Sequence, residues 1–131
     1  MPHTAQCQCG QVTITCQGDP VRVSVCHCLA CQRRSGSAFA AQVRFPRDRV
    51  RMTGTTKDYV RTADSGNRVH QQFCPECGTG TSYYMADTPD VVAVPMGLFD
   101  APYFATPAFS VYEKRRHPWL AITAEGIAHS D

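Results

Sequence analysis

Hydrophobic and polar residues alternate in two stretches near the start of the chain. Residues 12–17 read Val-Thr-Ile-Thr-Cys-Gln, and residues 21–25 read Val-Arg-Val-Ser-Val. Because successive side chains of a strand point to opposite faces of a sheet, this period of two predicts a half-buried strand in each stretch. Gly18-Asp19-Pro20 lies between the stretches and predicts a turn.

Shorter stretches of the same kind predict further strands, each bounded by Gly, Pro, Asp or Asn. They cover residues 38–44, 50–53, 59–61, 81–85 and 91–94. No segment keeps a period of 3.6 residues, so helix is expected only in short turns just after Cys31 and near residues 101–103. The chain is therefore expected to be mainly β with short antiparallel sheets, and residues 1–131 are expected to form a single domain.

The charge of the chain narrows the classes of partner. Its 131 residues include 13 Lys plus Arg against 11 Asp plus Glu, which gives a formal net charge of +2. The charges are interspersed without a long basic run, so no nucleic-acid partner is expected.

Residues 1–10 lack the apolar core of a secretory signal, and no later stretch approaches the roughly 20 apolar residues of a membrane span. We therefore expect a cytoplasmic protein without a membrane partner.

Eight cysteines are a strong compositional bias for a chain of this length. In an oxidising compartment, an even number of cysteines would suggest a disulfide framework. In a reducing cytosol, clustered thiols are more often metal ligands, and thiolates select zinc, copper(I) or iron–sulfur clusters. We therefore expect the cysteines to bind metal.

Seven of the cysteines fall in three clusters, Cys7-Gln8-Cys9-Gly10, Cys26-His27-Cys28-Leu29-Ala30-Cys31 and Cys74-Pro75-Glu76-Cys77-Gly78. Residues i and i+2 of an extended strand share a face, so each Cys-x-Cys pair is expected to close on one ion. A Cys-x-x-Cys pair does the same through a tight turn, and Gly78 permits the left-handed backbone that such a turn often needs.

The seven thiolates divide most naturally into a set of three and a set of four. The compact set, called the triplet below, is Cys26, Cys28 and Cys31. The larger set joins the two remaining pairs, Cys7/Cys9 and Cys74/Cys77. Four thiolates close a zinc ion, which is then structural, whereas three leave a position for water or substrate, as catalytic zinc requires. We expect about two zinc ions per chain, although spacing alone leaves other partitions open.

The three clusters resemble the pattern of the glutathione-dependent formaldehyde-activating family, which is Cys-x-Cys-Gly, then Cys-x-Cys-x-x-Cys, then Phe-Cys-x-x-Cys-Gly. This chain carries the pattern at residues 7–10, 26–31 and 73–78. The resemblance continues at Gly36-Ser37-Ala38-Phe39, Gly97-Leu98-Phe99-Asp100, Pro118-Trp119 and Glu125-Gly126, and covers roughly residues 5–127.

The resemblance implies a zinc-bound, mainly β, tent-like fold, with the set of four on a structural ion and the triplet on a catalytic one. The family joins glutathione to formaldehyde to give S-hydroxymethylglutathione and is classed among carbon–sulfur lyases. The implied partners are therefore a small thiol such as glutathione and an aldehyde. The open zinc would bind the thiol, lower its pKa and present the thiolate to the aldehyde carbon.

Arg33 and Arg34 follow the triplet directly and are candidate substrate-binding residues. Zinc with three thiolates is formally anionic, so nearby cations would help to hold a further thiolate or a carboxylate-bearing thiol. The alternative is that both arginines are solvated surface groups.

Several other residues are expected to have structural roles. His27 lies between two expected ligands, but its strand parity directs it away from the metal. Cys16 shares the parity of Val12 and Ile14 and is expected to be a buried packing residue. The residues expected in the core or at its rim, rather than in a pocket, are Tyr83, Tyr84 and Trp119.

Two other classes of function compete with the lyase. One is a non-catalytic zinc-stabilised binding or thiol-carrier module, since the family includes relatives such as centromere protein V that are not established enzymes. The other is a nucleic-acid-binding zinc ribbon, against which the weak net charge and the unequal arrangement of seven cysteines argue. The sequence does not indicate an oligomeric state.

Overall fold

The structure, a computed structural model, describes residues 2–101 and 104–131. Its strands are β1 Pro2–Gln6, β2 Thr13–Gln17, β3 Arg22–Cys26, β4 Ala40–Pro46, β5 Val50–Thr53, β6 Lys57–Thr62, β7 Arg68–Phe73, β8 Gly80–Met85, β9 Val91–Pro95, β10 Phe109–Val111 and β11 Ala128–His129. Helix α1 spans Leu29–Ser35, and the short 3₁₀ turns η1, η2 and η4 span Arg47–Arg49, Met96–Leu98 and Glu113–Arg115. No helix in these described ranges is long and apolar enough to cross a membrane.

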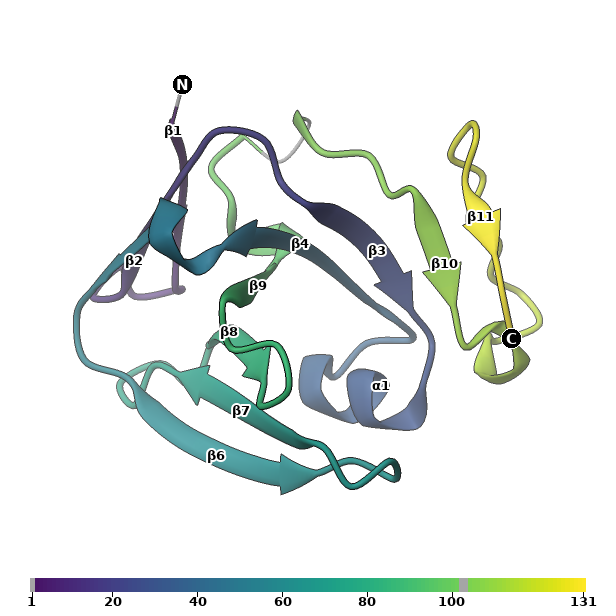
Figure 1. Cartoon of the computed structure of the whole chain (residues 1–131), viewed down its shortest axis with the longest axis horizontal. Coiled ribbons are helices and arrows are strands. Elements are labelled where there is room, and N and C mark those ends of the chain that lie inside the picture. Colours follow the sequence, from purple (N-terminus) through teal and green to yellow (C-terminus); the bar gives the residue numbers. More distant parts are fainter. Residues whose placement is uncertain (1, 102–103) are drawn as a thin grey trace.

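The strands form two sheets (Figure 1). The smaller sheet has three strands in the order β1-β2-β5, and the larger has eight in the order β11-β10-β3-β4-β9-β8-β7-β6. Most pairings are antiparallel, but β10 pairs in parallel with β3 and with β11. The fold is thus mainly β with short sheets, as expected, and has one parallel edge that the sequence pattern does not predict.

The main hydrophobic core lies where the smaller sheet packs against the β3-β4-β9 part of the larger one. Buried side chains at alternate strand positions meet there, including Ile14, Cys16, Val43, Phe45, Val92 and Val94. Because side chains alternate along a strand, the residues between these positions on β4 and β9 point to the opposite face of the larger sheet. That opposite face carries the candidate site.

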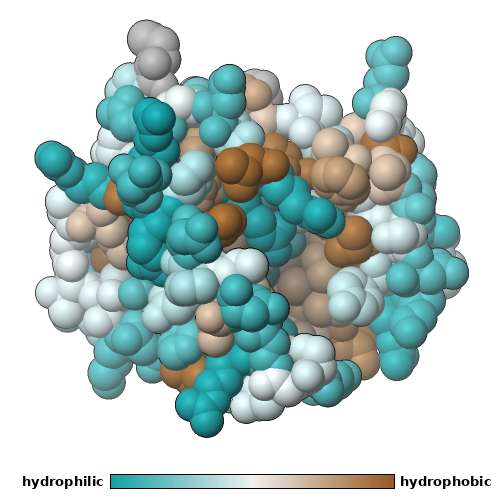
Figure 2. Space-filling model, viewed as in Figure 1, coloured by the Kyte–Doolittle hydropathy of each residue, from teal (hydrophilic) through white to brown (hydrophobic). Residues whose placement is uncertain are grey.

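The larger sheet curves around a cavity. Residues of β3 and β4 line this cavity together with residues of β6 and β7, although these strands are far apart in the strand order. Figure 1 shows β6 and β7 opposite β3 and β4, with α1 between them. In the same view, hydrophilic residues cover most of the surface, and hydrophobic residues appear as small separate patches around a central hollow (Figure 2).

All the strands predicted from alternation are present, with small shifts at their ends. The pattern misses β1, β7, β10 and β11, because at most one side chain in each is buried and the rest give no apolar repeat. The helical turn expected just after Cys31 is instead helix α1, which begins before that residue, at Leu29. A second helical turn was expected near residues 101–103. Residues 102 and 103 lie outside the described residues.

Gly54 is required by the close approach of two chain segments. Its φ is +98°, and a Cβ atom placed on it would lie 2.1 Å from the Gln11 carbonyl oxygen. The Gln11 side chain in turn donates to the Thr55 carbonyl oxygen at 2.6 Å and accepts from the Thr55 N–H at 3.0 Å. The segment before β2 is therefore fixed against the segment after β5.

We predict that Gly54→Ala lowers the free energy of unfolding more than Gly18→Ala does. Gly18 also has a positive φ, +78°, but nothing lies within 4 Å of the added Cβ, so its substitution costs only about 1–2 kcal/mol of backbone strain. Gly54→Ala adds a clash with backbone, which costs roughly 1–3 kcal/mol more. Denaturant titration of the two variants measures the difference, and equal losses would contradict the close packing at Gly54.

Candidate metal centres and the adjoining cavity

Four cysteine side chains from two distant turns meet in one cluster. Their sulfur atoms, from Cys7, Cys9, Cys74 and Cys77, all lie within 4.8 Å of one another. The Cys7 and Cys9 sulfurs are 3.6 Å apart, and the Cys9 and Cys74 sulfurs are 3.7 Å apart. Tetrahedral zinc with bonds of about 2.3 Å separates its sulfur ligands by roughly 3.8 Å. The cluster therefore fits a four-coordinate zinc ion.

Both turns of this cluster are closed by glycine. Gly10 N–H donates to the Cys7 carbonyl oxygen at 3.1 Å, and Gly78 N–H donates to the Cys74 carbonyl oxygen at 2.8 Å. Gly78 has φ +80°, which confirms its predicted left-handed conformation. The prediction that Cys7 and Cys9 share a face of an extended strand is wrong, because β1 ends at Gln6 and the two cysteines lie in the turn that follows.

Neighbouring groups stabilise the ionised form of Cys74 and Cys77, whereas burial and the surrounding thiols raise the pKa of Cys9 to about 12. The Gln11 amide donates to the Cys74 sulfur at 3.0 Å, and the Val12 N–H donates to the Cys7 sulfur at 3.3 Å. Hydrogen bonds from the Thr79 hydroxyl and backbone lower the pKa of Cys77 to about 5. Thiolates are the form that binds zinc, so this environment favours metal binding.

The triplet lies where β3 leads into α1. Cys26 ends β3, Cys28 is the N-cap of α1, and Cys31 is in its first turn. The Cys28 sulfur accepts a hydrogen bond from the Cys31 N–H at 3.3 Å, which fixes the start of the helix. The expected strand geometry for Cys26 and Cys28 is therefore wrong, although their sulfurs and that of Cys31 do lie within 4.8 Å of one another.

The chemistry of the triplet also fits a metal ion. The neighbouring Cys26 thiol, together with the Arg34 guanidinium, lowers the pKa of Cys31 to about 5, whereas the hydrogen bond to Cys31 raises the pKa of Cys26. Three crowded thiols do not all ionise without a cation to balance their charge. No further His, Cys, Asp or Glu side chain of the described residues joins this group, so an ion held there would keep one position open.

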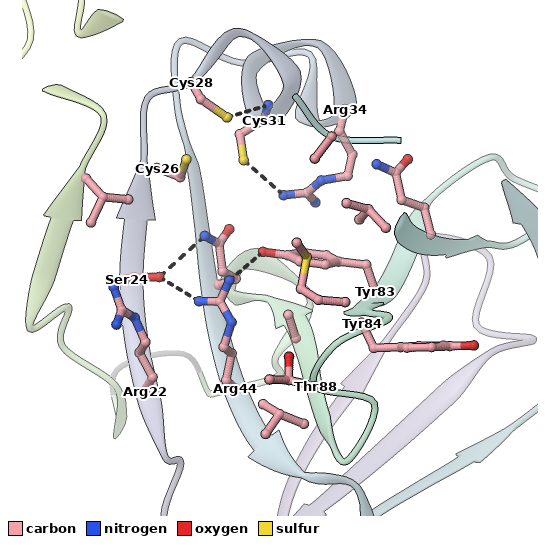
Figure 3. A pocket seen from close by; sticks show the side chains of 18 of the residues that line it. Arg22, Ser24, Cys26, Cys28, Cys31, Arg34, Arg44, Tyr83, Tyr84 and Thr88 are labelled. Carbon is pink, nitrogen blue, oxygen red and sulfur yellow. Dashed lines mark hydrogen bonds between the residues drawn. The ribbon is translucent and has the colours of Figure 1, made fainter. Parts of the chain in front are cut away.

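The triplet opens into a cavity of about 700 Å³ (Figure 3). All three of its cysteines line the cavity. The remaining walls combine apolar side chains with hydroxyl, amide and guanidinium groups. This is the composition of a small-molecule site, in which apolar walls exclude water and a few polar groups orient the ligand.

The two arginines predicted to bind substrate differ in position. Arg34 lines the cavity, where its guanidinium lies 3.9 Å from the Cys31 sulfur and stacks over the Tyr83 ring at 4.5 Å. Arg33 is exposed and lines a second hollow that shares Cys28 and Arg34 with the cavity. Of the two arginines, only Arg34 therefore lines the cavity into which the triplet opens.

The expectation that Tyr83, Tyr84 and Trp119 belong to the core or its rim is confirmed for Tyr83 and wrong for Trp119. Tyr83 is buried in a small core cluster with Val69 and Ala93, and it also lines the cavity, as Tyr84 does. Trp119 is 72% exposed. Sequence reasoning also missed most of the polar residues of the cavity, among them Ser24, Gln42 and Arg44. Ser24 shares the strand parity of Cys26, and this parity is the one sequence signal that could have identified it.

A family model described as glutathione-dependent formaldehyde-activating enzyme matches residues 2–115. The chain belongs to this formaldehyde-activating family. Among solved structures, the chain resembles a crystal structure of a Rhodobacter sphaeroides protein with a TM-score of 0.59 and 20% sequence identity, covering 74% of this chain and 87% of that one. That likeness concerns the fold alone. No match was found among curated proteins.

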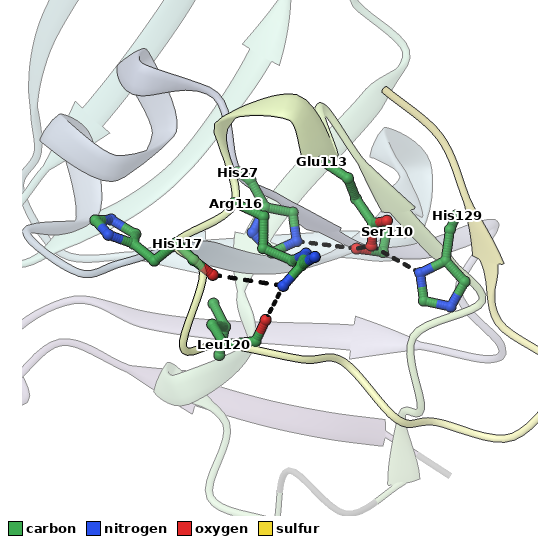
Figure 4. Close-up of polar contacts among 7 residues, drawn as sticks. All are labelled: His27, Ser110, Glu113, Arg116, His117, Leu120 and His129. Carbon is green, nitrogen blue, oxygen red and sulfur yellow. Dashed lines mark hydrogen bonds and ion pairs between the residues drawn. The ribbon is translucent and has the colours of Figure 1, made fainter.

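In this member of the formaldehyde-activating family, a chain of polar side chains runs from the buried His27, next to two residues of the triplet in the sequence, to the exposed His129 (Figure 4). His27 is fully buried, and its Nε2 lies 2.9 Å from the Ser110 hydroxyl. Ser110 donates to Glu113 Oε2 at 2.7 Å, and His129 Nδ1 lies 2.7 Å from the same oxygen. Because Ser110 gives its proton to Glu113, it accepts from His27. His27 therefore contacts Ser110 in the protein interior, in keeping with the structural role predicted for it.

The eighth cysteine is a core residue, as predicted. Cys16 is fully buried with Ile14 and Val12 and belongs to neither sulfur cluster. Burial raises the pKa of its thiol to about 11, so it remains protonated.

We predict that Glu113→Gln reduces the dependence of stability on acid pH. Hydrogen bonds from His129 and then Ser110 lower the pKa of Glu113 in the folded state. A carboxyl with a depressed folded-state pKa stabilises the protein above its unfolded pKa of about 4.3, and this contribution is lost as the pH falls through the folded value. The difference in unfolding free energy between the natural protein and the variant should therefore shrink below about pH 4.

Chemical denaturation at a series of pH values measures this difference. Glu125→Gln is the matched control, because it removes one negative charge from an exposed glutamate. A difference between the natural protein and Glu113→Gln that stays constant across the acid range would contradict the assignment.

Proposed function

We propose that this protein is a zinc-dependent carbon–sulfur lyase that acts on the adduct of a small thiol and an aldehyde, with glutathione and formaldehyde as the first candidates. The observation that carries the proposal is the position of the triplet at the wall of a cavity, with no fourth ligand from residues 2–101 and 104–131. A closed four-thiolate site could not offer a position to a substrate. Membership of the formaldehyde-activating family supports the same reaction class.

We propose Cys26, Cys28 and Cys31 as ligands of a catalytic zinc and Cys7, Cys9, Cys74 and Cys77 as ligands of a structural one. Zinc at the triplet would act as a Lewis acid that favours the ionised form of a substrate thiol. In the synthetic direction, a sulfur–carbon bond forms, the aldehyde C=O π bond opens, and the thiol proton ends on the aldehyde oxygen. Seven reduced thiols suit a reducing compartment, and we propose the cytoplasm.

The residues of the cavity would position the substrate for this step. Arg34, beside Cys31, supplies positive charge where the ionised sulfur develops. The apolar side chains of Val69, Met85 and Ala93 line the cavity and exclude water from this part of its wall. The cavity thus places the positive charge of Arg34 near the triplet. The apolar wall lowers the local dielectric constant, which strengthens the attraction between this charge and an ionised sulfur.

The two-ion assignment predicts the zinc content of cysteine variants. The natural protein should contain about two zinc ions per chain, and Cys28→Ser about one, because it removes a ligand from the three-thiol set alone. Cys74→Ser should lose the structural ion and fail to fold, since structural zinc contributes on the order of 10–16 kcal/mol. Elemental analysis of the purified proteins measures these contents.

Cys16→Ala is the matched control for those variants. It should keep the full zinc content and lose only about 1 kcal/mol of stability through lost packing. Loss of one zinc equivalent from Cys16→Ala, or mainly iron in the natural protein, would overturn the assignment of ligands.

The reaction itself is tested by the rate at which formaldehyde exchanges with its thiol adduct. We predict that zinc-loaded protein accelerates exchange between formaldehyde and S-hydroxymethylglutathione, measured by NMR at equilibrium, and that the Cys28→Ser protein does not. S-methylglutathione should bind at least about 10-fold more weakly than glutathione, because its sulfur cannot ionise. Glutathione binding without accelerated exchange would instead favour the non-catalytic thiol-carrier function.

A further inference from the structure

A network of polar side chains lies on the floor of the cavity, away from the triplet (Figure 3). In the larger sheet, Arg44 of β4 pairs with Ala93 of β9, which in turn pairs with Tyr83 of β8. The small Ala93 side chain lets Arg44 reach across it. Arg44 donates to the Ser24 hydroxyl at 2.9 Å and to the Tyr83 hydroxyl at 3.1 Å.

This network has more hydrogen-bond donors than acceptors. A guanidinium only donates, so the Ser24 and Tyr83 oxygens accept from it, and each hydroxyl keeps its own proton to give. Burial raises the pKa of Tyr83, so that hydroxyl remains protonated. The Gln42 amide nitrogen lies 3.4 Å from Ser24 Oγ, and its buried Oε1 has no partner within the described part of the chain. Turning this amide over would let Ser24 donate to Oε1.

Apart from the triplet sulfurs, of which that of Cys31 lies beside Arg34, the cavity holds positive charge without a counter-charge from the described residues. Its positively charged lining residues are Arg22, Arg34, Arg44 and Arg61. No Asp or Glu of the described residues lines it, and the ion pair between Glu113 and His129 lies outside it. The Nε of Arg61 is buried without a hydrogen-bond partner in the described ranges. Hydroxyl donors and arginines without acidic partners around one cavity favour an anionic ligand.

The position of Arg44 relative to the triplet limits the size of that ligand. Ser24, which Arg44 contacts, and Cys26 lie on the same face of β3, two residues and therefore roughly 7 Å apart. A ligand that places sulfur at the triplet and an anionic group at Arg44 needs only a short carbon chain between them. A planar guanidinium matches the two oxygens of a carboxylate, and the neighbouring hydroxyl and amide donors add to that match.

We propose that Arg44, with Ser24, Gln42 and Tyr83, forms a carboxylate-binding subsite that selects small thiols carrying a carboxylate without an ammonium group beside it. The thiol part of this inference rests on the proposed function, and the carboxylate part does not. 3-Mercaptopropionate belongs to the selected class. The glycyl end of glutathione does too, since its ammonium group is at the other end of the molecule. Cysteine and cysteamine should bind more weakly, because their ammonium group would lie close to the arginines of the cavity and be repelled by them.

The test is a calorimetric titration of zinc-loaded, full-length protein with 3-mercaptopropionate, 2-mercaptoethanol, cysteamine, glutarate and inorganic phosphate. Glutarate carries carboxylates without a thiol and therefore reports on the subsite alone. Arg44→Gln removes the charge, and Arg51→Gln, an exposed arginine of β5 in the other sheet, is the matched control. Tyr83→Phe removes one hydroxyl and serves as a second variant if Arg44→Gln fails to keep its zinc.

We expect the natural protein to bind 3-mercaptopropionate at least about 10-fold more tightly than 2-mercaptoethanol or cysteamine. Arg44→Gln should weaken both 3-mercaptopropionate and glutarate by about 10- to 100-fold, the loss typical of a hydrogen bond to a charged group, and leave 2-mercaptoethanol within about twofold. Tyr83→Phe should weaken glutarate by about 3- to 10-fold. Arg51→Gln should change none of these affinities.

Three results would overturn the subsite. These are equal weakening of both thiols by Arg44→Gln, glutarate binding that does not depend on Arg44, and tighter binding of phosphate than of glutarate. Arg44-dependent glutarate binding with no binding of any thiol would support the subsite and overturn the proposed function. Thiol binding without Arg44-dependent glutarate binding would support the proposed function and overturn the subsite.

Discussion

The convergence of four sulfur atoms from two turns, 65 residues apart at Cys9 and Cys74, is the constraint on which the rest of this structure depends. Cys7 and Cys74 are almost fully buried and belong to the main hydrophobic core, so the sulfur cluster and the core form one unit. Zinc in this cluster would contribute on the order of 10–16 kcal/mol, as much as the whole stability of a typical small domain, about 5–15 kcal/mol. The cluster ties the turn before β2 to the β7-β8 hairpin, and this hairpin supplies one wall of the cavity.

Because side chains alternate along β3, β4 and β9, the two faces of the larger sheet have different roles. One face of these strands, with Val23, Val43 and Val94, packs into the core and gives the sheet its rigidity. The other face, with Ser24, Cys26 and Arg44, lines the cavity. Cys26 of the triplet and the proposed carboxylate subsite therefore lie on the same rigid sheet. The sheet holds the proposed thiol and carboxylate positions at a fixed separation.

Local sequence signals were sufficient for the sulfur clusters and most of the strands. Cysteine spacing predicted the triplet and each pair, and the alternation of Val12, Ile14 and Cys16 predicted their burial, because both depend on residues close in the chain. The meeting of the two pairs, 65 residues apart, was inferred from the number of thiols that the triplet leaves over. The backbone geometry at Cys7 was predicted wrongly, since a Cys-x-Cys pair closes equally well in a turn. Arg44 and Tyr83 could not be predicted to meet, because their contact depends on the strand order β4-β9-β8. The contact of His27 with Ser110, 83 residues later, depends likewise on the parallel pairing of β3 with β10.

The most direct test of one closed and one open metal centre is ¹¹³Cd NMR of the cadmium-substituted protein, titrated with 3-mercaptopropionate. The two sulfur clusters predict two cadmium resonances of equal area. Only the resonance of the triplet should move when the thiol is added, because the four-thiol cluster has no free position. A single resonance, or two resonances that both ignore the thiol, would contradict the division into a structural and an open site.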